Sequence, residues 1–93
     1  MFKTNDYFDG KVKSVAFDSA EGPATIGVMA AGEYEFGTST KEIMQVVSGS
    51  MEIKMPGSDT WQTMRQGDTF EVAKDSKFDV RISGDTSYLC LYK

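Results

Sequence analysis

The chain has 93 residues, of which 14 are acidic and 10 basic, so that the formal net charge is −4. A chain of this length supports one domain with one thin core, and we expect that domain to span residues 1–93. The basic side chains form no stripe of the kind that neutralises phosphates, which argues against a nucleic acid polymer as partner.

Cys90 is the one cysteine, so no internal disulfide can form. This favours a reducing compartment, and we expect a cytoplasmic protein. Cys90 lies in an apolar strand pattern and is predicted to be a buried small hydrophobe. The amino terminus lacks the apolar stretch of a secretory signal, and no apolar run approaches the ~20 residues that span a bilayer. We therefore expect no membrane partner.

Short segments that alternate between apolar and polar residues follow one another along the chain, separated by turns rich in Gly, Pro, Asp and Ser. Such alternation predicts strands. In chain order they are expected at residues 11–17, 24–31, 33–37, 42–48, 51–55, 61–64, 69–73, 78–82 and 87–92. Gly32 is expected to break the second of these, and Gly49 with Ser50 to form a hairpin turn. We find no helix pattern, which predicts an all-β antiparallel barrel or sandwich.

One spacing is typical of the two signatures of cupin barrels. Glu42 is followed after six residues by Gly49, and Gly32–Gly37 lies just upstream. Gly67–Val72 is similar to the start of the second signature. The fold predicted is therefore a small antiparallel cupin-like barrel of the jelly-roll type.

The histidines that hold a metal in such barrels are missing, since the chain contains none. The second-signature histidine falls on Phe78, and those of the first fall near Glu35 and Gly37, or near Phe36 and Thr38 if the loop is one residue shorter. A hard cation could still use Glu35 and Glu42. Metals that prefer nitrogen or sulfur lack ligands, so we expect no catalytic metal and no cofactor.

The chain also resembles a family of small single-domain cupins, the pyrimidine/purine nucleoside phosphorylases. The resemblance covers nearly the whole chain and is carried by Asn5–Ser14, Gly27–Met29, Gly32–Phe36, Val47–Gly49, Trp61–Gln62, Gly67 and Thr86–Cys90. It implies phosphorolysis of several ribonucleosides to a free base and ribose 1-phosphate. It also implies orthophosphate as cosubstrate and a homodimeric, cytoplasmic protein that needs no metal.

Phosphorolysis of a nucleoside requires a proton or hydrogen bond for the departing base, a group that suits a cationic ribose, and donors for phosphate. Glu42 is the first candidate for the acid, because the signature directs it inward, and Glu35 is the second. A buried carboxyl acquires a raised pKa, which suits a proton donor. Rings could stack on the base, or could simply fill the core; the candidates are Tyr34, Phe36, Phe78, Tyr88 and Tyr92.

Thr38, Ser39 and Lys41 lie together before Glu42 and are the candidate donors for phosphate. Arg81 is expected to point outward if its neighbours Val80 and Ile82 are core, and Lys11 and Lys13 are further possibilities. Two other functions stay open. One is a small-molecule-binding cupin module, or sensor, without turnover, and the other is a structural or interaction domain with a filled interior.

Overall fold

The computed structural model describes residues 1–93 and consists of strands joined by turns, without helices. The strands are β1 (Lys3–Tyr7), β2 (Val12–Ser19), β3 (Gly22–Met29), β4 (Gly32–Gly37), β5 (Glu42–Ser48), β6 (Ser50–Lys54), β7 (Gln62–Arg65), β8 (Thr69–Val72), β9 (Lys77–Ile82) and β10 (Thr86–Tyr92). The structure accordingly has no helix that could cross a membrane.

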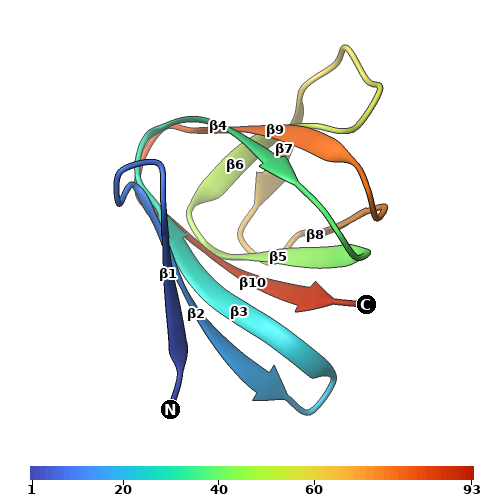
Figure 1. Ribbon diagram of the computed structural model, residues 1–93. Helices are drawn as coiled ribbons and strands as arrows, with labels where there is room; N and C mark the ends of the chain where they lie inside the picture. Colours follow the sequence, from blue (N-terminus) through green and yellow to red (C-terminus); the bar gives the residue numbers. More distant parts are fainter.

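Two antiparallel sheets face each other (Figure 1). The larger has the strand order β1-β2-β3-β10-β5-β8, and the smaller has the order β4-β9-β6-β7. Strands β1, β2 and β3 extend beyond the smaller sheet, below it in Figure 1. The cupin-like jelly roll expected from the sequence is confirmed, but the two sheets form a sandwich and do not close into one continuous barrel.

Alternation along the strands places one set of side chains between the sheets. In β9 the buried residues Phe78, Val80 and Ile82 alternate with partly exposed ones, and β6 repeats the pattern with Met51 and Ile53. Period two of this kind follows from the strand geometry, in which successive side chains point to opposite faces. The resulting core joins both sheets and includes Val12, Met29, Tyr34, Met44, Val46, Met51, Ile53, Phe70, Val72, Phe78, Val80, Ile82, Tyr88 and Cys90.

The structure differs from the sequence prediction at three places. Strand β1 was not expected, and it pairs along its whole length with β2. Gly32 does not merely end a strand but begins β4. The hairpin expected at Gly49 is wrong, because β5 pairs with β8 and β10 whereas β6 pairs with β7 and β9. At Gly49, which has a φ of +87°, the chain instead crosses from one sheet to the other.

Candidate active site

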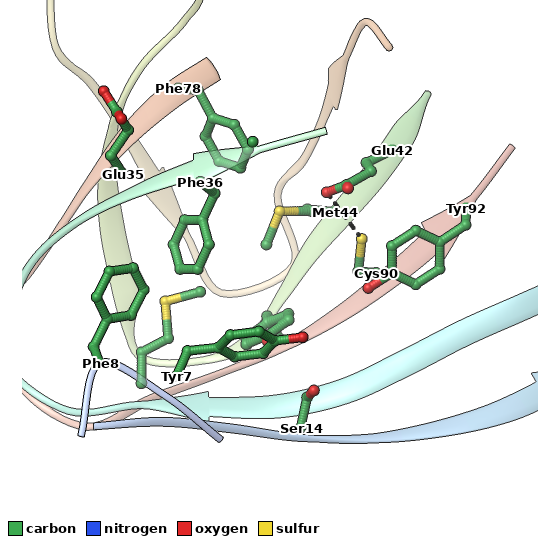
Figure 2. A pocket seen from close by; sticks show the side chains of 13 residues that line it. Tyr7, Phe8, Ser14, Glu35, Phe36, Glu42, Met44, Phe78, Cys90 and Tyr92 are labelled. Carbon is green, nitrogen blue, oxygen red and sulfur yellow. Dashed lines mark hydrogen bonds between the residues drawn. The ribbon is translucent and has the colours of Figure 1, made fainter. Parts of the chain in front are cut away.

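A cavity of about 320 Å³ lies between the sheets, which is the size of a small-molecule site. Figure 2 shows Phe8, Phe36 and Phe78 toward one end of the cavity and Glu42, Cys90 and Tyr92 toward the other. The lining residues are Tyr7, Phe8, Ser14, Met29, Glu35, Phe36, Gly37, Glu42, Met44, Phe78, Tyr88, Cys90 and Tyr92. The interior is therefore hollow at this place and not filled by its own side chains.

The apolar end is built by Phe8, Phe36 and Phe78. The centroids of Phe36 and Phe78 are 5.7 Å apart, and the Phe8 ring stands edge-on to Phe36 at 5.6 Å. Phe8 reaches this position through the β1–β2 turn, where Phe8, Asp9 and Gly10 all have left-handed φ angles of 54°, 57° and 84°. Residues other than glycine adopt this region at a cost in free energy, so the contacts of the Phe8 ring have to offset the strain of the turn.

The opposite end holds Glu42, the first residue of β5. Its neighbours across the sheet are Tyr92 in β10 and Val72 in β8. Burial raises the pKa of the Glu42 carboxyl above its ordinary value, while a hydrogen bond from Cys90 acts in the other direction. The Cys90 thiol donates to Glu42 Oε1 across 3.6 Å. Because burial outweighs that bond, Glu42 is disposed to keep a proton in the cavity.

Cys90 and Tyr92 complete this end of the cavity as neutral groups. Burial, together with the nearby Glu42 carboxylate, raises the pKa of Cys90 to about 12. The thiol therefore stays protonated near neutral pH and acts as a donor, not as a nucleophile. Burial likewise raises the pKa of Tyr92, whose hydroxyl lies 3.0 Å from Thr25 Oγ1. The prediction that Cys90 is buried is confirmed, but its sulfur also faces the cavity.

Of the acid and ring candidates named from the sequence, only Tyr34 does not line the cavity; those that do are Glu35, Glu42, Phe36, Phe78, Tyr88 and Tyr92. The candidate phosphate donors lie elsewhere. Thr38 is buried, and its hydroxyl donates to Ala73 O at 2.7 Å and accepts from Ser76 N at 3.0 Å. Ser39 and Lys41 are exposed in the loop before β5 and do not line the cavity.

Other charged residues lie away from the centre of the cavity. Glu35 borders it but is exposed and points away from Glu42 (Figure 2). Arg81 lies on the outer face of the smaller sheet, as expected, with its guanidinium carbon 3.8 Å from the centre of the Trp61 ring. No lysine or arginine lines the cavity. Its only charged lining groups are therefore two carboxyls.

The donor set does not fit a metal ion. Nowhere do three or more His, Cys, Asp or Glu side chains gather as a metal site requires. Phe78, at the position of the second-signature histidine, lines the cavity as a ring, and so does Phe36, which lies near the positions of the first-signature histidines.

Among the lining residues without an assigned role in the sequence analysis are Tyr7, Phe8 and Ser14. They belong to β1, to the following turn and to β2. The signal that could have found them is the segment Asn5–Ser14, which carries part of the family resemblance.

Comparison with known proteins identifies the family. The model of the family described as pyrimidine/purine nucleoside phosphorylase matches residues 2–92. The chain belongs to the pyrimidine/purine nucleoside phosphorylase family. A member of this family from Pseudomonas putida (strain W619) is 62% identical over 93 residues, covering 100% of this chain and 99% of the relative. One from Pseudomonas aeruginosa (strain LESB58) is 61% identical and is covered over 100% of both chains.

Solved structures show the same fold. A protein of unknown function from Vibrio parahaemolyticus superposes with a TM-score of 0.93 at 40% identity, covering 97% of this chain and 96% of that one. A cupin from Shewanella frigidimarina has a TM-score of 0.72 at 14% identity, covering 96% and 80%. At that identity the second likeness concerns the fold alone, and it agrees with the cupin-like arrangement of this family member.

Proposed function

We propose that this chain is a broad-specificity nucleoside phosphorylase that needs no metal. It converts purine and pyrimidine ribonucleosides and orthophosphate to free base and ribose 1-phosphate. The observation that carries the proposal is a half-buried carboxyl, Glu42, with a raised pKa, facing a cavity whose other end is made of rings. Membership of the family named for this activity supports it.

In the proposed step the bond between the anomeric carbon and the base nitrogen breaks while a phosphate oxygen bonds to that carbon. The transition state resembles an oxocarbenium ion, as in glycoside cleavage. Protonated Glu42 gives its proton to the departing base, and the proton that phosphate loses on bonding to the sugar returns to Glu42. Atoms and charge balance without any further reactant, and a general acid of this kind contributes roughly 10²–10⁴-fold to a rate.

The base stacks against the apolar end of the cavity, which is formed by Phe36, Phe78 and Phe8. Stacking on a ring does not depend on the hydrogen-bonding edge of the base, so one wall can hold purines and pyrimidines alike. Phosphate has no cation inside the cavity. Of the predicted donors, Thr38 already donates its hydroxyl proton to Ala73 O, which leaves Ser39 and Lys41; Lys41 is favoured because it adjoins Glu42 and is exposed.

The test is a base-release assay with inosine and uridine, each with and without orthophosphate. We expect turnover only with phosphate, lowered about 10²-fold or more in Glu42→Gln. Glu71→Gln, which changes an exposed carboxyl on β8, is the matched control and should be unaffected. Saturable nucleoside binding without turnover supports the sensor instead. The absence of both binding and turnover supports an interaction domain. Activity that disappears on chelation and returns with a divalent ion contradicts the metal-free mechanism.

We also propose that the chain acts in the cytoplasm as a homodimer that pairs through the outer face of the larger sheet. A solvated sheet face is normally polar, but here Val15, Ile26 and Leu89 lie side by side across β2, β3 and β10. Val15 and Ile26 are exposed, as is Val28 beside them. A second copy would cover this face, as a small domain gains core by pairing.

Sedimentation tests the homodimer directly. The wild type should sediment as a dimer and Ile26→Glu as a monomer, because the substitution places a charge within the apolar row. Thr63→Glu, on an exposed position of β7 in the other sheet, is the control and should stay dimeric. A monomeric wild type contradicts the proposal.

A further inference from the structure

Gly27 allows the Tyr88 ring to lie directly against strand β3. Gly27 and Tyr88 are paired across β3 and β10. A Cβ atom at Gly27 would be only 2.5 Å from Tyr88 Cζ and Oη. Atoms do not approach so closely, so any other residue at 27 would lift the ring off the strand and into the cavity. The open space above the ring therefore depends on Gly27.

The hydroxyl of Tyr88 differs from those of the other tyrosines in the body of the sandwich. Tyr34 donates to Ala30 O at 2.6 Å, and the Tyr92 hydroxyl pairs with Thr25. Buried tyrosine hydroxyls usually find such partners. Tyr88 is only 6% exposed, yet its hydroxyl bonds to no carbonyl or carboxylate of the chain, and its polar neighbour is the Ser14 hydroxyl.

The Ser14 side chain is buried to about the same extent as Tyr88, and its hydroxyl is likewise available to a ligand. It is 4% exposed, and Asn5 Nδ2 donates to its Oγ across a long 3.5 Å. Both Ser14 and Tyr88 line the cavity. Figure 2 shows Ser14 near Tyr7, with Glu42 across the same space. Within the protein these two hydroxyls bond only to each other and to Asn5, so each keeps bonding capacity for a ligand that carries hydroxyls of its own.

We propose that Ser14 and Tyr88 form a subsite for the ribose hydroxyls of a nucleoside, held open by Gly27. The proposal rests on the proposed function and specifies how its substrate is placed. Neutral hydroxyls both donate and accept, as sugar hydroxyls do, whereas phosphate oxygens would favour charged donors. With the sugar on Ser14 and Tyr88 and the base against the phenylalanine rings, the glycosidic bond lies between the two ends of the cavity.

The test compares uridine with 2′,3′-dideoxyuridine, measured by titration calorimetry in phosphate-free buffer, where phosphorolysis cannot proceed. The wild type should prefer uridine by about tenfold or more, since each hydrogen bond contributes roughly 1 kcal/mol. Tyr88→Phe and Ser14→Ala should each weaken uridine binding severalfold and leave the dideoxy analogue unchanged. Equal losses of affinity for both ligands in these variants, or a wild type that binds both ligands equally well, overturn the proposed subsite.

The role of Gly27 is tested by rescue. Gly27→Ala should weaken the binding of both ligands about tenfold or more, because the displaced Tyr88 ring fills part of the cavity. Adding Tyr88→Ala removes the clash and should restore binding of the dideoxy analogue but not the preference for uridine. Gly27→Ala with unchanged binding overturns the proposal. If base release depends on phosphate but the protein shows no preference for uridine over the dideoxy analogue, only the subsite is contradicted. If there is neither binding nor base release, both the subsite and the proposed phosphorylase function are contradicted.

Discussion

Substituting Gly49 by alanine should destabilise the fold at the point where the two sheets are joined. Gly49 follows β5, which carries Glu42, and precedes β6, which belongs to the other sheet. Its φ of +87° is one that alanine adopts only with strain. A Cβ atom there would also lie 2.7 Å from Thr86 Oγ1. That hydroxyl donates to Ser50 O and Gly84 O at 3.0 and 2.9 Å, so moving it weakens both contacts.

The expected loss of stability is the sum of two contributions, backbone strain and the weakened Thr86 contacts. The left-handed conformation costs about 1–2 kcal/mol for a residue with a Cβ. Weakening the Thr86 contacts adds about 1–2 kcal/mol, since a typical hydrogen bond contributes roughly 1 kcal/mol. Gly49→Ala should therefore lower the free energy of unfolding by about 2–4 kcal/mol. Gly57→Ala isolates the first term, because Gly57 has a φ of +76° with nothing within 4 Å of the added Cβ.

Urea unfolding gives the free energies of both variants and thermal unfolding gives their Tm, each followed by the fluorescence of the single tryptophan, Trp61. For a domain of this size, 1 kcal/mol shifts Tm by about 4–8 °C, so Gly49→Ala should melt at least ~4 °C below Gly57→Ala. Equal losses in the two variants would show that the contact with Thr86 has no energetic weight, and the reasoning from close approach would be refuted.

Three further predictions concern Glu42, Cys90 and Trp61. Because burial raises the folded-state pKa of Glu42, the ionised carboxylate weakens the fold as pH rises; Tm of Glu42→Gln should exceed that of the wild type at pH 8 and match it below about pH 4. Cys90→Ala removes the bond that lowers the pKa of Glu42, so the alkaline limb of kcat/KM should move to higher pH, and Cys90→Ser should restore it. Trp61→Ala should cost about 1–2 kcal/mol of stability through its contacts with Arg81 and Lys54, yet leave KM for nucleosides unchanged in kinetic assays.

The strands that sequence reasoning located best are those with one apolar face. Residues 42–48 form β5 as predicted, and Phe78, Val80 and Ile82 are buried in β9 as their spacing required. Strand β1 has no such pattern, because its sequence is polar except for Tyr7. Its position depends on pairing with β2 and on a turn of three left-handed residues, neither of which leaves an alternation to detect. The crossing at Gly49 was missed for a related reason, since a glycine turn is compatible with a hairpin or with a change of sheet.

The candidate site was predictable where spacing and alternation agree. Glu42 at the start of β5 and Phe78 near the start of β9 both line the cavity, as their spacings from the signature glycines predicted. Loop residues are positioned by contacts that spacing and alternation do not reveal. Thr38 is turned inward by its bonds to Ala73 and Ser76, which are more than 30 residues away in sequence, so its closeness to Glu42 along the chain did not place it at the cavity.

The replacement of imidazoles by rings and the raised pKa of Glu42 have one physical origin. In a metal-binding cupin the signature glutamate faces a cation, which favours its ionised form. Here Phe36 and Phe78 occupy that region, and no lysine or arginine lines the cavity. Without a cation nearby, burial is the main influence on the carboxyl, and burial favours the protonated form. Apolar rings in place of metal ligands therefore make the same glutamate a candidate acid in place of a candidate ligand, and in the proposed function they also form the wall on which the base stacks.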